Sequence, residues 1–453
     1  MNGSRRLAMG AGRLAVVLGL LLLACSAAAD ETSTPDSVST ATPRYDAERA
    51  QPQPIRMGHF RPLDARGLNV FEPPKAEGVA YHGFDLEWGA AFTQQFQGLR
   101  HQNQPDTSAT NRLIHMGAGF NNADANLYLN AQLARGIRVQ LTSYLSSRHH
   151  NETWVKDGYL LIDGSPWAIP QLDQLMKYVT LRMGHFEINY GDMHFRRSDN
   201  GQAMFNPLVG NLIMDAFTTE IGGELYVRAN GLMAMGAVTG GEVRGQVLKP
   251  EQRSPSYMGK AGFDRQLTKD LRTRLTGSFY VNRQSTNNTL YSGSRAGSRY
   301  FYVLENQNAT ESAQAWSGDL QPGFRQRVTA WVVNPFVSYR GLELFGNLEQ
   351  AKGKAANEAS DRTWTQLAGE GVYRFVGNQF YLAARYNTAK GKLTLAGSEA
   401  TVRRLEAGGG WFLTPNLEAK AEYVQQHDDD FPVNDVRHGG HFDGAMFEAV
   451  VSF

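Results

Sequence analysis

Several side chains that could do acid–base chemistry stand in polar stretches of this 453-residue sequence. Histidine precedes three carboxylates in the run from His427 to Asp430, and further histidines occur at His149, His150 and His438. Histidine can act as a general base near neutral pH when a carboxylate orients its ring. No nucleophile stands at a fixed spacing from these histidines, so the sequence predicts no catalytic residue and ranks an enzyme behind other functions.

Metal binding has one candidate, the acidic run Asp428-Asp429-Asp430, whose carboxylate oxygens could hold Ca²⁺. Acidic runs in loops are more often simply solvated, so we expect no metal and no cofactor. Cys25 is the only cysteine. If an export signal that contains it is removed, the mature chain can form no disulfide, catalytic thiol or cysteine-ligated metal site.

A second charged group lies between a predicted strand near 178–188 and another that starts near Thr219. It comprises Asp192, His194, Arg196 and Arg197. A constriction built from arginine favours anions, so Arg196 and Arg197 could attract anions if this stretch narrows a channel. In an exposed loop they would only be solvated or bind lipid phosphates.

The elements that would position these residues begin after an export signal. The only sustained apolar run, 14–24, follows three arginines and predicts a signal peptide over 1–29. Ala27-x-Ala29 suits ordinary cleavage, whereas Leu22 to Cys25 would suit lipidation of the cysteine. We favour ordinary cleavage.

Composition excludes several classes of protein. The formal charge is +1, from 45 Lys and Arg against 44 Asp and Glu, and there is no basic run, which argues against nucleic acid as a partner. Beyond the signal no stretch approaches the ~20 apolar residues of a spanning helix. The mean hydropathy of −0.41 is also too polar for a helical membrane bundle. A membrane protein of this composition must be a closed β-barrel, in which only alternate residues need to be apolar.

Two further regions follow the signal peptide. Residues 30–80 are rich in Pro and Ser and predict a periplasmic, partly disordered segment. From 81 to 453, segments of about ten residues alternate apolar and polar side chains, which is the signature of β-strands. The clearest runs from Phe84 through Leu86, Trp88 and Ala90 to Phe92.

The connections between these segments alternate in length, as in outer-membrane barrels with short periplasmic turns and long extracellular loops. Short turns are predicted at 229–231, 268–270, 340–341, 376–378 and 414–416, and long loops near 240–255, 283–326, 351–363, 389–401 and 426–442. Treating 113–133 as one strand gives about sixteen strands, whereas splitting it at Asn121-Asn122 gives seventeen. The predicted fold is therefore an all-β, antiparallel transmembrane barrel of about sixteen strands.

The chain ends on an apolar row, Ala445, Phe447, Ala449, Val451 and Phe453. A terminal strand that stops on an aromatic residue is typical of barrels delivered to the barrel-assembly machinery. We therefore interpret Phe453 as an assembly signal, on a strand that closes against the one near Phe84.

The alternation also predicts which charges face the lumen. The pore-lining candidates are Arg138, Arg182, Glu224, Arg272, Arg274, Arg385 and Arg404, and the same parity points Lys260, Asp85, Glu87, Glu370, Glu418 and Glu448 inward. The two signs are nearly balanced. This supports an aqueous interior without establishing selectivity for anions.

Two segments resemble the phosphate-selective porin O and P family. They are Asp157-Gly158-Tyr159-Leu160 and the run from Leu181 to Gly191, which contains Arg182, Gly184 and Phe186, and the turn from Trp411 to Leu417 is also common in such porins. The resemblance covers about 84–453 and implies a porin-like barrel and a homotrimer. Glu187 and Asn189 depart from the family, which tends to have Lys and Pro there, and this departure puts phosphate selectivity in doubt.

A barrel of about sixteen strands leaves an aqueous channel. The sequence therefore predicts an outer-membrane porin for passive diffusion of small hydrophilic solutes or ions, anions among them. The alternatives are a structural, adhesive or specific-transport barrel and, third, a barrel enzyme. The expected partners are outer-membrane lipid and lipopolysaccharide, the assembly machinery and the solutes themselves.

Overall fold

The computed structural model describes residues 60–73, 75, 81–107, 110–121, 124–146, 152–167, 169–241, 251, 253–292 and 299–453. These residues belong to one compact unit that spans 51–453. The predicted signal peptide, residues 30–59 and the pair His149-His150 lie outside the described residues. Within the described ranges, no helix is long and apolar enough to cross a membrane.

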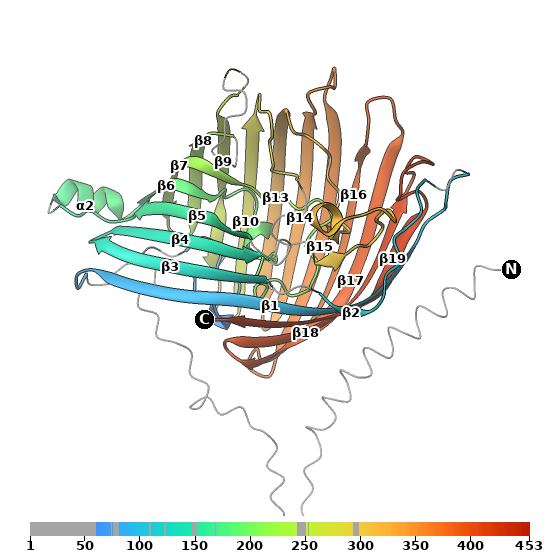
Figure 1. Cartoon of the computed structure of the whole chain (residues 1–453). Coiled ribbons are helices and arrows are strands. Elements are labelled where there is room, and N and C mark those ends of the chain that lie inside the picture. Colours follow the sequence, from blue (N-terminus) through green and yellow to red (C-terminus); the bar gives the residue numbers. More distant parts are fainter. Residues whose placement is uncertain are drawn as a thin grey trace, which may run out of the picture. The chain divides into compact units, whose positions relative to one another are not determined.

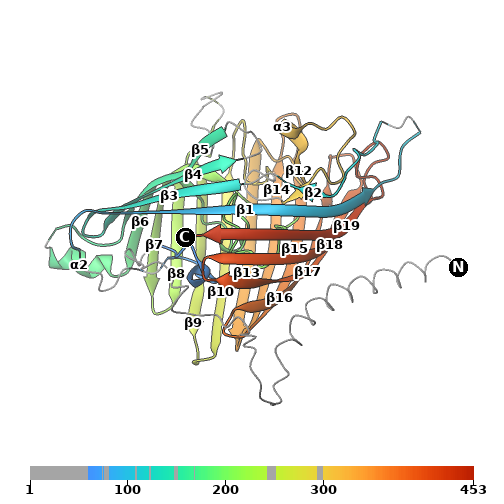
Figure 2. The ribbon, with the colours of Figure 1, turned by 60° about the horizontal axis from the view of Figure 1, so that its bottom comes forward.

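The described chain forms an antiparallel barrel in which each strand pairs with its neighbours in sequence and β1 pairs with β19. The sixteen strands of the wall are β1 Asp85–Gln102, β3 Asp124–Ala134, β4 Ile137–Ser146, β5 Glu152–Ile162, β6 Val179–Glu187, β7 Thr219–Ala229, β8 Leu232–Thr239, β9 Ser256–Gln266, β10 Leu271–Asn282, β13 Arg327–Tyr339, β14 Leu342–Lys354, β15 Arg362–Phe375, β16 Phe380–Lys392, β17 Glu399–Thr414, β18 Leu417–Asp429 and β19 Gly440–Ser452. The predicted fold class and strand number are confirmed. Both views show β1 beside β19, which closes the ring (Figure 1, Figure 2).

The segment predicted as one strand over 113–133 is divided. β3 begins at Asp124, and the two-residue strand β2, Gly119–Phe120, pairs separately with the far part of β1. Because β2 prolongs the β3 side of β1, it adds no strand to the circuit of the wall. The division therefore leaves sixteen strands and does not produce the seventeen considered above.

Side chains alternate between a buried inner face and an exposed outer face along the strands. On β1 the outward residues Leu86, Trp88 and Phe92 are 46–62% exposed, whereas Ala91 and Thr93 are buried. An apolar outer face on a sheet without free edges is the form in which β-strands cross a bilayer. The architecture therefore places the chain in the outer membrane.

The five predicted short turns are confirmed. Asn230-Gly231 and Arg340-Gly341 have positive φ at both residues, as two-residue hairpin turns require. Three long loops were predicted too long, because the strands extend further than expected. β14 to β17 extend through Lys354, Arg362, Lys392 and Glu399, β18 ends at Asp429 and β19 begins at Gly440, which leaves only 355–361, 393–398 and 430–439 as loops. Charged residues interrupt the apolar pattern at these strand ends, but the strands stay paired beyond the band of outward apolar side chains.

Two features of the short-turn end were not predicted. The connection between β5 and β6 carries helix α2, Pro170–Met176, while the short helix α3, Glu311–Gln314, lies at the opposite end (Figure 2). Residues 60–73, here called the strap, include the 3-10 helix η1, Ala65–Gly67, and bury Phe60 and Phe71. This part of the 30–80 segment is therefore packed against the barrel.

Candidate functional site in the barrel lumen

The connection between β6 and β7, residues 188–218, folds into the lumen and is here called the inward loop. Its side chains are almost all buried, and those of Ile213, Met214 and Asn206 have no exposed surface. The 3-10 helix η2, Met193–Phe195, lies in its first half. All four residues predicted for a constriction, Asp192, His194, Arg196 and Arg197, belong to this loop.

The two predicted anion-attracting arginines are neutralised by carboxylates. Arg196 contacts Glu370 at 2.6 Å and Glu343 at 3.4 Å. Arg197 forms two hydrogen bonds with Asp215, one of them of 2.9 Å. Both guanidinium groups are buried. Neither is available to attract an anion, because its charge is already balanced within the lumen.

Asp192 is the centre of a buried ion cluster. Its carboxylate accepts hydrogen bonds of 2.8 Å from Arg274 and Thr276 and lies 2.7 Å from Lys260. Glu72 of the strap contacts the same two cations, at 2.8 Å and 3.1 Å. Burial alone would raise the pKa of Asp192 and Glu72, but Lys260 and Arg274 outweigh it and hold both pKa values below their usual range.

A second ion cluster joins the start of the inward loop to β5. Lys156 donates hydrogen bonds to Glu187 at 2.5 Å and to Asp199 at 2.8 Å. Glu187 is one of the two residues that depart from the porin O and P pattern, and Lys156 neutralises it. Parity could not place Lys156 inward, because the pairing of β4 with β5 shifts register between Thr142 and Ser143.

The second half of the inward loop, residues 200–214, is held mainly through its backbone. Glu422 accepts hydrogen bonds from the amides of Val209 (2.6 Å) and Gly210 (3.2 Å). Lys420 donates to the carbonyls of Ala203 (2.6 Å) and Asn206 (2.9 Å). The side chains of Arg385, Asn387, Gln366 and Arg404 bind further backbone groups between Gly210 and Met214. Side chains of strands β15 to β18 therefore hold the main chain of this half in place through hydrogen bonds.

The strap crosses the lumen at the short-turn end. Its Ala65 amide donates to the carbonyl of Pro415, in the turn between β17 and β18, at 2.9 Å. Asn69 donates to Glu343 of β14 at 2.6 Å, and the Pro73 carbonyl accepts from Arg228 of β7 at 2.5 Å. The strap therefore lies across the mouth between the C-terminal strands and β7. Few features of the sequence could indicate that the strap enters the lumen. Its apolar residues follow no strand or helix period, and they pack against the inward loop.

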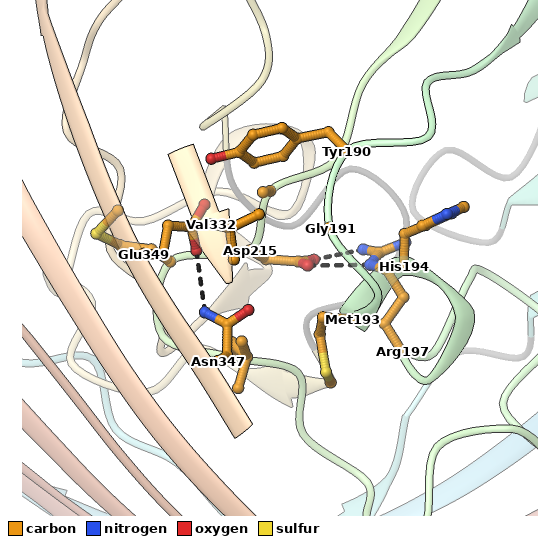
Figure 3. A pocket seen from close by; sticks show the side chains of 12 residues that line it. Tyr190, Gly191, Met193, His194, Arg197, Asp215, Val332, Asn347 and Glu349 are labelled. Carbon is orange, nitrogen blue, oxygen red and sulfur yellow. Dashed lines mark hydrogen bonds and ion pairs between the residues drawn. The ribbon is translucent and has the colours of Figure 1, made fainter. Parts of the chain in front are cut away.

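Two cavities border residues 189–197 of the inward loop. One, of about 60 Å³, lies at the short-turn end and is lined by Thr180, Arg182, Tyr226 and Arg228 of β6 and β7, with Asn189 and His194 from the loop. The other is about 10 Å³ and lies between the loop and β13 and β14; Figure 3 shows Arg197 facing Asp215 in it, with Asn347 beside Glu349.

His194 lines both cavities and so separates them. Its ring lies against that of Phe195, with centroids 3.7 Å apart and planes tilted by 42°, and is 3.5 Å from the Glu187 carboxylate. Burial lowers the pKa of His194, so its imidazole is neutral at pH 7.

The predicted pore-lining residues all point inward, and their partners are carboxylates or polar groups of the lumen. Arg138 pairs with Asp163, Arg182 with Glu224, Arg272 and Arg274 with Asp264, Arg385 with Glu370, and Arg404 with Gln426. Arg228 was not singled out by the sequence. No carboxylate of the described residues pairs with it, and its Nε has no hydrogen-bond partner.

The remaining chemical candidates lie elsewhere. His427 faces outward on β18, Asp428 is buried beside Gln426, and Asp429 pairs with Arg403. The described residues contain no group of three or more His, Cys, Asp or Glu side chains placed to hold a metal. The acidic run is therefore divided between the two faces of the barrel.

No family model and no curated protein matches this chain. Among solved structures, an anion-selective porin from Comamonas acidovorans is similar over 82% of this chain and 100% of its own, with a TM-score of 0.52 and 11% identity. OprB of Pseudomonas putida matches 85% of this chain and 99% of its own, with a TM-score of 0.48 and 11% identity. The outer membrane channel DcaP of Acinetobacter baumannii matches 83% of this chain and 99% of its own, with a TM-score of 0.48 and 9% identity. The first likeness shows that the two chains share the barrel fold.

Proposed function

We propose that this chain is an outer-membrane porin, a channel for passive diffusion of small hydrophilic solutes and ions. The main support is the sixteen-strand barrel, whose inner face is polar and charged. Its lumen holds an inward loop that is bordered by two cavities. A lumen lined by ion pairs suits water-soluble cargo. The passage follows the 189–197 side of the loop, where these cavities lie.

Selectivity for anions is the finer part of the proposal. It rests on Arg228 and not on Arg196 or Arg197, because Arg228 lines the 60 Å³ cavity and forms no ion pair among the described residues. The carboxylates of Glu72 and Asp163 line the same cavity and interact with Arg228 only at longer range. Reversing its charge in R228E should shift the reversal potential toward cations in asymmetric salt. R340E, at an exposed turn, is the matched control. An unchanged potential in R228E would refute this assignment.

Conductance tests the proposed function itself. Purified protein in planar bilayers should produce discrete current steps in KCl, and phosphate can be compared with chloride under the same gradient. Bilayers that stay sealed at high protein load would refute the porin proposal and favour the structural or adhesive alternative.

Four further proposals concern the ends and the assembly of the chain. Residues 1–29 are removed as a signal peptide and residues 30–80 lie on the periplasmic side, which N-terminal sequencing and protease protection can test. Phe453 acts as an assembly signal; its amide pairs with the Ala90 carbonyl at 2.9 Å where the barrel closes. Deleting Phe453 should reduce heat-modifiable barrel in the membrane, and crosslinking of the purified protein should reveal the proposed trimer.

A further inference from the structure

A row of outward polar side chains crosses the outer face of the barrel near the long-loop end. Strand pairing places Thr388, Arg403, His427, His441 and Gln102 side by side on β16, β17, β18, β19 and β1. The rings of His427 and His441 are stacked, with centroids 5.6 Å apart. These side chains face the surroundings of the barrel and not its lumen.

The row lies where the apolar outer belt ends. The outward residues of β16 are Phe380, Leu382, Ala384 and Tyr386, followed by Thr388, Lys390 and Lys392. The opposite limit of the belt carries the stacked rings of Phe375, Phe380 and Trp411. Such a change from apolar to charged residues marks the depth at which lipid tails give way to headgroups. The row therefore lies at the headgroup level of the outer leaflet.

A groove of about 300 Å³ opens on this row, and we call it the rim groove. It is lined by Tyr386, Arg403, Arg404, Leu405, Gln425 and His427. Leu405 and Tyr386 are 45% and 50% exposed, so they offer an apolar surface below the polar row. One end of the groove thus suits an acyl chain, and the other suits a polar headgroup.

Arg403, beside His427, brings a positive charge to the lining of the rim groove itself. The charges around the groove are balanced, with Lys390, Lys392 and Arg403 against Glu399, Asp429 and Asp430. Arg403 lies 2.6 Å from Asp429, but the two side chains are 52% and 39% exposed. An exposed pair of this kind contributes little free energy, so a phosphate can replace the carboxylate at a small cost.

We propose that the rim groove binds a phosphorylated lipid of the outer leaflet. The lipid phosphate contacts Arg403 and His427, and an acyl chain lies along Leu405 and Tyr386. Arginine suits this role because its planar guanidinium can donate two parallel hydrogen bonds to phosphate oxygens. The proposal depends on the membrane location of the barrel and is independent of channel activity.

Binding of bisphosphorylated lipid A to the purified full-length protein in detergent tests the proposal. R403A should weaken binding about tenfold, the equivalent of losing one charged hydrogen bond. D429N should bind more tightly than the unchanged protein, because Arg403 loses its competing carboxylate. R340A is the matched control, since Arg340 is also exposed and lies 3.0 Å from an aspartate, Asp270, but at the short-turn end.

Several outcomes would overturn the assignment. Unchanged affinity in R403A, or an equal loss in R340A, would show that the groove does not recognise the lipid. Equal affinity for dephosphorylated lipid A and for bisphosphorylated lipid A would show that the groove does not recognise the phosphate. Displacement by inorganic phosphate at equal concentration would show that the acyl chain contributes nothing. The opposite shifts expected for R403A and D429N also separate binding from a general loss of folding.

Discussion

The two halves of the inward loop are held in the lumen by different interactions. Residues 200–214 are anchored through backbone amides and carbonyls, which bind side chains of β15 to β18 such as Glu422 and Lys420. Residues 188–199 are anchored mainly through buried ion pairs, with Asp192 on Lys260 and Arg274 and with Asp199 on Lys156. The 60 Å³ cavity borders the ion-paired half alone, whereas the 10 Å³ cavity lies between the two halves and is also lined by Leu212 and Met214.

This difference assigns separate roles to the two halves. Backbone anchors fix the path of the chain whatever the neighbouring charges, and they fill the lumen on the β15 to β18 side. Ion pairs depend on the protonation and identity of a few side chains, and removing one partner leaves a buried charge behind. Single charge changes should therefore reshape the ion-paired half and its passage, and have much smaller effects on the other half.

The largest effect is expected for D192N. The substitution keeps the shape of the side chain but leaves Lys260 with only Glu72 as a counter-charge, and Arg274 with Glu72 and Asp264. We expect a loss of about 3–5 kcal/mol in the free energy of unfolding and a larger unitary conductance, because the first half of the loop moves from the wall. Urea unfolding in lipid vesicles and single-channel recording measure the two effects. Conductance equal to that of the unchanged protein would contradict the role given to Asp192.

Low pH should have the same effect as D192N on the first half of the loop. The pKa values of Asp192 and Glu72 are lowered, so their contribution to stability is complete above the unfolded values of about 4. It is lost only as the pH falls through the lower, folded values. The Asp192 cluster should therefore persist from pH 8 to pH 5 and be lost only below about pH 4. Burial raises the pKa of Asp199, so its pair with Lys156 should weaken before the Asp192 cluster as the pH falls. A transition near neutral pH would show that other groups control the loop.

E72Q should have an intermediate effect. Glu72 contacts the same two cations as Asp192, but Asp192 remains to balance them. The lost charged hydrogen bonds should cost about 1.5–3 kcal/mol, less than D192N costs. Because the strap would loosen at the short-turn end, proteolysis of residues 60–73 should become faster. Equal stability losses in E72Q and D192N would show that the strap matters as much as the loop.

E422Q provides the matched neutralisation on the backbone-anchored half and should have the smallest effect. Glutamine retains an oxygen that can accept from the amides of Val209 and Gly210, and no cation depends on Glu422 for its main counter-charge. We expect a loss of about 1 kcal/mol and unchanged conductance. A channel enlarged as much as in D192N would remove the distinction between the two halves.

Much of the wall could be predicted from the sequence. A period of two fixes which residues face outward, and turn residues such as Asn230-Gly231 mark the short-turn end. The extensions of β14 to β17 were missed because Lys354 and Lys392 look like loop residues, although strands above the bilayer tolerate charge on either face. Helix α2 and the strap gave no comparable signal, since neither has a strong periodicity of its own.

The lumen was harder to predict than the wall. Parity pointed Arg274 and Arg385 inward, but it could not show that Arg196 would meet Glu370, 174 residues away. That pairing depends on how far the inward loop reaches across the barrel. A local sequence pattern shows that a charge is present without showing whether another segment neutralises it. The selectivity implied by the resemblance to the porin O and P family stays a prediction for this reason.

Cysteine accessibility during conductance tests most directly whether the passage follows the ion-paired half of the loop. In a Cys25→Ser background, T180C places a thiol in the 60 Å³ cavity, and A383C places one on β16 where Met204 and Leu208 pack. A charged thiol reagent should reduce the current through T180C and leave A383C unchanged. Reaction of A383C with T180C unaffected would contradict the account, because the passage would then lie on the opposite side of the lumen.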